Sequence, residues 1–155
     1  MDYYLSLGGR MVEAMLNTTT FLTPPPYGNY NAGYYGKKTE ASFISASALA
    51  SVLGLTAGTA ETSVPMSWLQ MAYKNKLIYY PVRAFRYGLS WDQIYNVGAA
   101  FDIQGDQGKP STVTLRNQNT QVVINGLTYR VRLMSVNEWV ALIQPLLESW
   151  LPTFK

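Results

Sequence analysis

The chain of 155 residues is long enough for one domain with a hydrophobic core, since 48 % of it is hydrophobic. Only 14 % of the residues are charged, roughly half the usual share, and the net charge of +3 is spread without a run of like charges, which argues against a nucleic-acid-binding tail. The absence of cysteine and histidine excludes disulfides, Ser-His-Asp and Cys-His catalytic sites and the usual zinc sites.

The surface must therefore be covered by uncharged polar residues, among them 12 tyrosines, which is typical of a protein that buries much of its surface against partners. No stretch approaches 18 apolar residues, so no membrane insertion is expected. The N-terminal sequence MDYYLSLGGR lacks the basic region and the apolar run of a signal peptide. We therefore expect the protein to be kept, or assembled, in the cytosol in which it is made.

The first 40 residues predict a short helix followed by an arm. Residues 10–16 carry an apolar pattern that favours a helix. In residues 17–40, three prolines at 24–26 favour an extended polyproline conformation, and the glycines that follow disfavour a helix. We therefore expect residues 17–40 to form an extended arm or a long loop. Its four tyrosines are Tyr27, Tyr30, Tyr34 and Tyr35.

These tyrosines predict that the arm docks on a neighbouring subunit, because four tyrosines free in water would be an unusual hydrophobic patch. A disordered or lid-like loop is the alternative. On the arm hypothesis, deletion of residues 17–40 should leave the second half of the chain folded but impair assembly.

Residues 41–55 are small and apolar at helical spacing, and Gly54 follows where such a helix would end. A strand of small residues is the alternative. Residues 56–63, rich in threonine, alanine and glycine, predict a linker. We accordingly divide the chain into an N-terminal segment, residues 1–63, which carries the arm, and a second unit, residues 64–155.

The second unit contains two hairpin patterns. Aromatic-rich runs at residues 68–73 and 77–82 predict the first hairpin. The dipeptide Asn125-Gly126 is a strong signal for the turn of a second hairpin over residues 122–133. Apolar and polar residues alternate after that turn, so one face of the strand is expected in the core.

Two capping boxes predict helices in the same unit. Ser90 with Gln93 begins one helix, and Ser135 with Glu138 begins another, which Pro145 is expected to stop or restart. Together with the hairpins, these elements predict an α+β fold: a compact module of antiparallel hairpins with two or three short helices, plus an extended N-terminal arm.

No set of residues has the spacing of a catalytic or metal site. Asp92 and Glu138 lie in the first turns of predicted helices, where capping and the helix dipole explain a carboxylate. Residues 102–108 resemble part of a calcium loop but lack the ligand at its fifth position and the closing glutamate, so we favour a plain polar loop over residues 101–119. We therefore expect no enzyme, no catalytic residue, no cofactor and no metal.

Arg130 and Arg132 share one face of the predicted strand. With Arg83 and Arg86 they would form a basic strip that binds nucleic acid or an acidic partner. A solvated strand face with one or two ion pairs is the favoured alternative. The residues predicted to form an interface are Tyr27, Tyr30, Tyr34, Tyr35, Arg130 and Arg132.

An ordered set of motifs runs through residues 66–143: a W-L hairpin, an S-W-x-x-I-Y helix, an I-x-G-x-x-Y-x-V-R-L hairpin and an E-W helix. The matching residues are Trp68, Leu69, Lys76, Leu77, Ser90, Trp91, Ile94, Tyr95, Gly98, Ile124, Gly126, Tyr129, Val131, Arg132, Leu133, Glu138 and Trp139. In this order the motifs resemble a module of virion structural and tail-fibre-associated proteins of tailed bacteriophages. The last motif is also similar to an element of C-type-lectin-like folds. The resemblance implies no cofactor and no catalytic residue.

The resemblance and the composition together predict a non-enzymatic structural subunit of a tailed bacteriophage particle, in its tail, baseplate, neck or fibre attachment region. Its expected partners are other virion proteins and copies of itself, and its expected location is the virion, assembled in the cytoplasm of the host bacterium. The alternative is a receptor- or carbohydrate-binding module on the phage surface. Nucleic acid is not an expected partner.

Overall fold

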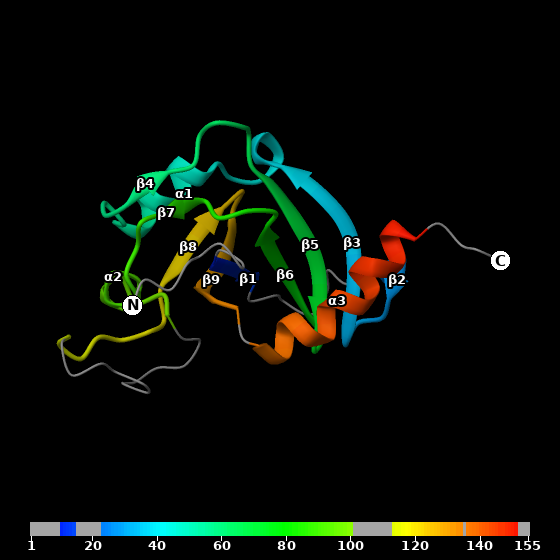
Figure 1. Cartoon of the computed structure of the whole chain (residues 1–155). Coiled ribbons are helices and arrows are strands. Elements are labelled where there is room, and N and C mark those ends of the chain that lie inside the picture. The colour runs from blue at the N-terminus through cyan, green and yellow to red at the C-terminus, as the bar shows by residue number, and fades with distance from the viewer. Residues whose placement is uncertain (1–9, 15–22, 101–112, 135, 152–155) are drawn as a thin grey trace.

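The computed structural model describes residues 10–14, 23–100, 113–134 and 136–151 (Figure 1). Within these ranges, seven strands form one antiparallel sheet in the order β2-β3-β5-β6-β1-β9-β8, and β4 pairs with β7 apart from it. The α+β class, with antiparallel hairpins and three α-helices in the described residues, is confirmed. The elements are β1 (Arg10–Ala14), β2 (Tyr27–Gly28), β3 (Ala32–Thr39), η2 (Glu40–Ser42), α1 (Ala46–Leu53), β4 (Thr59–Ala60), β5 (Ser67–Tyr73), β6 (Lys76–Pro81), β7 (Arg86–Tyr87), α2 (Trp91–Asn96), β8 (Gln121–Ile124), β9 (Leu127–Leu133) and α3 (Val136–Trp150).

The first described element, β1, is a strand, so the helix predicted over residues 10–16 is wrong. β1 lies between β6 and β9 and pairs antiparallel with both. Val12 is opposite Tyr79 on one side and opposite Val131 on the other. Because strands on both sides bond its backbone, tertiary pairing outweighs the local helical pattern.

The described part of the stretch expected as an arm, residues 23–40, contains two extended strands that pair within the sheet. β3 pairs with β5 from Ala32 to Thr39, and β2 pairs with β3 at the edge of the sheet. A Cβ at Gly33 would lie 2.3 Å from the Cγ of Pro25, so the glycine allows the proline run to pack directly on β3. Strands from residues 1–63 and from residues 64–155 therefore belong to one sheet.

The two predicted hairpins are confirmed. Lys74 and Asn75 connect β5 to β6 with φ of 48° and 60°, and Asn125 and Gly126 connect β8 to β9 with φ of 51° and 79°. Two successive left-handed residues form the turn that matches the right-handed twist of paired strands. These turns fix the register of both hairpins.

The predicted end of α1 at Gly54 and the predicted start of α2 at Ser90 are also confirmed. The Ser45 side chain accepts a hydrogen bond from the Ala48 amide at 3.1 Å, and Gly54 ends α1 in the left-handed conformation. At α2, the Ser90 and Gln93 side chains each bond the backbone amide of the other residue.

α3 runs from residue 136 to residue 150 without a stop at Pro145, so that prediction is wrong. The proline is buried, and a Cβ added to Gly28 of β2 would lie 3.0 Å from the Pro145 Cβ. Packing against the sheet edge therefore offsets the free-energy cost of the backbone hydrogen bond that the helix lacks at a proline.

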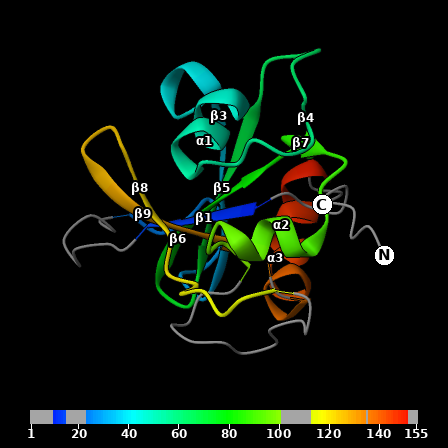
Figure 2. The ribbon, with the colours of Figure 1, turned by 90° about the vertical axis from the view of Figure 1, so that its left-hand side faces the viewer.

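Each face of the sheet buries its own core. On β5, Trp68 faces the core under α1 and α2, and Leu69 faces the core under α3. Figures 1 and 2 show α1 and α2 together at one end of the molecule, and Figure 1 shows α3 crossing β3 at the other. Phe43 is central to the first core, stacked on Tyr79 at 4.2 Å and edge-on to Trp68 at 5.3 Å between ring centroids.

Candidate functional site

The described residues hold no cluster of three acidic side chains of the kind that binds a metal ion. In the same part of the chain, no helix has the length and apolar character to cross a membrane. The residues of the calcium-like stretch, 102–108, lie outside the described residues.

The four tyrosines of the predicted interface do not share one exposed surface. Tyr34 lies in the core under α3, and burial raises the pKa of its hydroxyl, as does the nearby Tyr27. The Tyr27 ring packs 6.3 Å from the Tyr34 ring across the β2-β3 pair. The Tyr35 hydroxyl donates to the Thr23 carbonyl at 3.1 Å, and Tyr30 is half-buried. These side chains therefore fasten the sheet edge.

Arg132 is buried, and both terminal nitrogens of its guanidinium, Nη1 and Nη2, donate hydrogen bonds to the carboxylate of Glu138. One of these bonds, from Nη1 to Oε2, measures 2.7 Å. The pair joins β9 to the first turn of α3. Glu138 is therefore the ion-pair partner of Arg132. Ser135, with which Glu138 was expected to form a capping box, lies outside the described residues. Arg130 is half-buried on the same strand.

The other two arginines of the predicted basic strip bind backbone carbonyls. Arg86 donates to the carbonyls of Ala57 and Gly58 at 2.8 and 2.9 Å, and Arg83 donates to the Pro65 carbonyl at 3.2 Å. These bonds hold the chain that leaves α1 against β7 and β6. Arg83 and Arg86 therefore stabilise the loop between α1 and β5, and they do not form a continuous strip with the buried Arg132.

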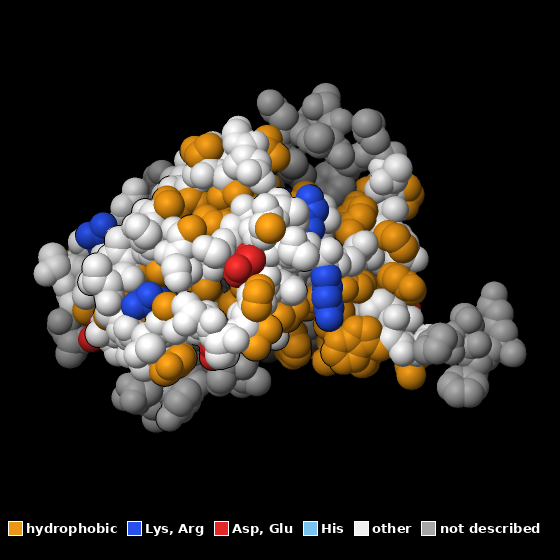
Figure 3. All heavy atoms as spheres, turned by 90° about the horizontal axis from the view of Figure 1, so that it is seen from above, with side chains coloured by type: hydrophobic (Ala, Val, Ile, Leu, Met, Phe, Trp, Pro, Cys, Tyr) orange, Lys and Arg blue, Asp and Glu red, His pale blue; other side chains and the backbone are white. Residues whose placement is uncertain are grey.

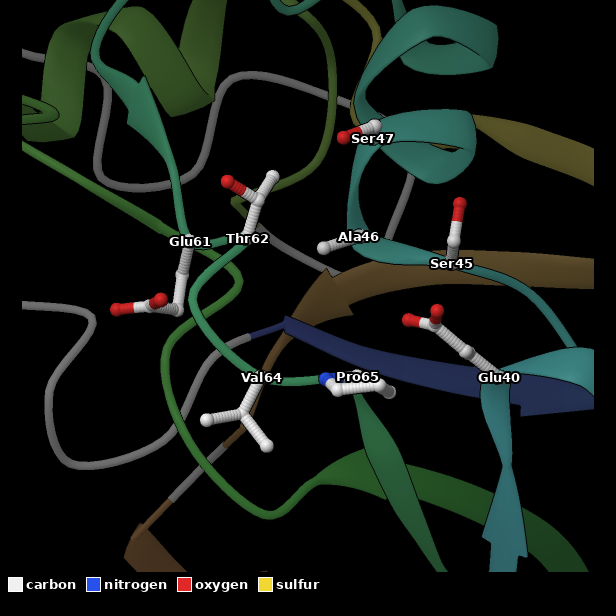
Figure 4. Close-up of a pocket in the computed structure, with 8 residues that line it drawn as sticks. All are labelled: Glu40, Ser45, Ala46, Ser47, Glu61, Thr62, Val64 and Pro65. Atoms are coloured by element: carbon white, nitrogen blue, oxygen red, sulfur yellow. The ribbon is translucent and has the colours of Figure 1, made fainter.

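A polar pocket of about 260 Å³, which no sequence pattern predicts, lies beside the start of α1 (Figure 4). Hydroxyl and carboxylate groups line it. In Figure 4 the Glu40 carboxylate points into the pocket, whereas the Glu61 carboxylate points away from it. The lining residues are Glu40, Ser45, Ala46, Ser47, Glu61, Thr62, Val64 and Pro65.

The two pocket carboxylates have separate roles. Glu40 accepts a hydrogen bond from the Met66 amide at 2.8 Å, which ties η2 to β5. Hydrogen bonds from the Ser63 side chain and amide hold the pKa of Glu61 below its ordinary value, so it is ionised at neutral pH. Because these two carboxylates do not face one another, they do not form an acid–base pair; the described lining offers hydrogen bonds to a polar ligand.

The outward-facing side of α3 is a second feature that was not predicted from the sequence. The side chains on this face are apolar and exposed, Val140 and Trp150 each by 63 %. Figure 3 shows hydrophobic side chains gathered at the side of the molecule on which Figure 1 shows β3 and α3. We call these residues the outer face of α3: Trp139, Val140, Ile143, Leu147, Trp150 and Leu151.

The sequence carried a signal for this face. Val140, Ile143, Leu147 and Trp150 follow one another at intervals of three, four and three residues, which is the spacing of a helix–helix seam. The expected break at Pro145 divided this pattern and hid it. Because α3 continues through Pro145, the four residues lie on one face of a single helix, apart from Leu142 and Leu146, which face the sheet.

Comparison of the chain with models of protein families, with curated proteins and with solved structures gives no match. The resemblance to a phage module therefore rests on the motif residues of this sequence.

Proposed function

We propose that this chain is a non-enzymatic structural subunit of a tailed bacteriophage particle, which acts through protein–protein assembly in the tail, baseplate, neck or fibre attachment region. The outer face of α3 carries the proposal, because exposed apolar surface of this extent on a helix packed against a sheet is typical of a protein interface. Its partners are other virion proteins and copies of itself, and its location is the virion, assembled in the host cytoplasm.

The places of the motif residues support the proposal. Trp68, Tyr95 and Tyr129 are buried in the core under α1 and α2, and Arg132 binds Glu138. These motif residues therefore stabilise the fold, so a chain that shares them in the same order is expected to share the fold. Function then depends on the exposed surfaces that the fold carries.

Quantitative mass spectrometry of density-purified particles tests the proposal. We expect the protein at a fixed copy number, a multiple of three or six relative to a known tail protein, because tail components are arranged in symmetric rings. A non-structural protein made in the same lysate serves as the control for contamination. Absence from the purified particles would refute the assignment.

The polar pocket favours a second candidate, a receptor- or carbohydrate-binding module on the phage surface. Sugars are recognised by hydroxyl and carboxylate groups, and Ser47, Thr62 and Glu40 contribute such groups to the lining of the pocket. Among the described residues, no aromatic ring lines the pocket for a sugar to stack on, so this candidate stands second.

Binding of the full chain to a glycan array tests the second candidate. Replacing Thr62 with valine keeps the size of the side chain but removes its hydroxyl, and we expect at least about a tenfold loss of affinity for a bound glycan. Thr128→Val, an exposed threonine on β9, is the matched control and should bind as the unaltered protein does. Equal binding by both variants would exclude the pocket as the sugar site.

A further inference from the structure

α3 has two apolar sides. Leu142 and Leu146 face the sheet and belong to the core with Tyr34 and Tyr80. The outer face carries the 3-4-3 series that starts at Val140, and Ile143 and Leu147 of that series are exposed by 37 % and 42 %. A helix that is apolar on both sides needs a second partner besides its own sheet.

The outer face is complementary to itself when two such helices run antiparallel. Positions of the series lie symmetrically about residue 145, so a two-fold axis at that level places the small Val140 opposite the large Trp150 of a second copy. The same axis places Ile143 opposite Leu147. Each layer of the seam then pairs a residue at an a position of one helix with a residue at a d position of the other, as in an antiparallel coiled coil.

We infer that the outer face of α3 pairs with the same face of a second copy of this chain, with the two α3 helices antiparallel across a two-fold axis. This inference rests on one part of the proposed function, namely that the chain acts by assembling with other protein subunits.

The exposed area is close to what a dimer needs. The six side chains of the outer face present on the order of 600 Å² of apolar surface, which is at the upper end for a single patch on a monomer. A standard interface buries about 800 Å² per partner, and the polar side chains beside the seam supply the remainder. Trp139 and Leu151 lie on the two flanks of the seam and widen it.

The charge of α3 also favours an antiparallel copy. The last turn of the helix has no basic residue, and Glu148 lies close to this negative end of the helix dipole. An antiparallel partner places the positive half of its own dipole beside this end. The outer face itself carries no charge that would repel an identical face.

Sedimentation velocity of the purified full chain tests the inference. We expect a dimer at micromolar concentration, and at least a tenfold higher dimer dissociation constant for Leu147→Glu, because the new carboxylate would be buried against Ile143 of the partner. Val52→Glu is the matched control, since it places the same charge at an exposed position of α1 and should leave the dimer intact. Circular dichroism establishes that each variant is folded; Val140→Glu repeats the test if Leu147→Glu is not.

A mixture of two variants tests the antiparallel register. Ile143→Lys and Leu147→Glu should each be monomeric alone, but an equimolar mixture should form heterodimers in which the new lysine faces the new glutamate. A monomeric unaltered chain, a dimeric Leu147→Glu variant or a mixture that fails to associate would each overturn the inference. None of these results depends on whether the protein is found in particles, so its failure is distinct from that of the proposed function.

Discussion

Replacing Glu138 with alanine is expected to lower the free energy of unfolding by about 3–5 kcal/mol, because it leaves the Arg132 guanidinium charged and buried without its carboxylate. The pair joins β9 to the first turn of α3, so its loss also weakens the attachment of the helix to the sheet. Urea unfolding followed by circular dichroism measures the change.

Three further variants isolate the cause. Glu148→Ala removes an exposed carboxylate from the same helix and should change stability by no more than about 0.5 kcal/mol. Arg132→Met combined with Glu138→Leu replaces the pair by apolar side chains and should recover most of the loss. Since buried charges are poorly screened, the effect of Glu138→Ala should persist at high salt. A loss no larger than that of Glu148→Ala would contradict the structural role of the pair.

The elements predicted correctly are those whose determinants lie within a few residues. Asn125-Gly126 adopts two left-handed conformations that few other dipeptides accept, so the turn can be identified without any knowledge of the rest of the chain. The same holds for the cap at Ser90, where both hydrogen bonds join residues three apart. Local chemistry therefore predicts both hairpins and the start of α2.

The errors concern strands whose partners are distant in the chain. β1 pairs with β6 and β9, more than 60 residues away, and nothing within residues 10–16 indicates those partners. In β3, glycine and tyrosine were typical of a flexible arm, whereas the glycine at position 33 serves close packing against Pro25. Composition alone does not distinguish a flexible glycine from one that a close contact requires.

The candidate site shows the same division. Alternation placed Arg132 on the polar face of β9, but α3 covers that face at its end and supplies Glu138 as a buried partner. A polar position in a strand therefore predicts a side of the sheet without predicting exposure to solvent. The outer face of α3 was missed for the opposite reason, since apolar residues in a helix are first assigned to the core of their own chain.

Deleting residues 17–40 is expected to unfold the second half of the chain, whereas a detachable arm would leave it folded. The deletion removes β2 and β3, and with them one of the two pairing partners of β5 and most of the surface on which α3 rests. It also removes Tyr34 from the core that contains Leu142 and Leu146. A domain is stabilised by only about 5–15 kcal/mol, so the combined loss of two strands at the edge of the sheet and of a buried aromatic side chain is expected to exceed the stability of the remaining chain.

Tyr34→Ala is the graded form of the same test and should cost about 3–5 kcal/mol, the range for a large aromatic side chain removed from a core. Tyr87→Ala, which truncates a half-exposed tyrosine on β7, is the matched control and should cost far less.

Amide hydrogen exchange of the chain that lacks residues 17–40 is the decisive measurement. Because α3 rests on β3, the amides of α3 should lose protection first. If the shortened chain keeps a cooperative transition and a protected α3, then β2 and β3 are accessory strands, and the fold depends on the hairpins alone.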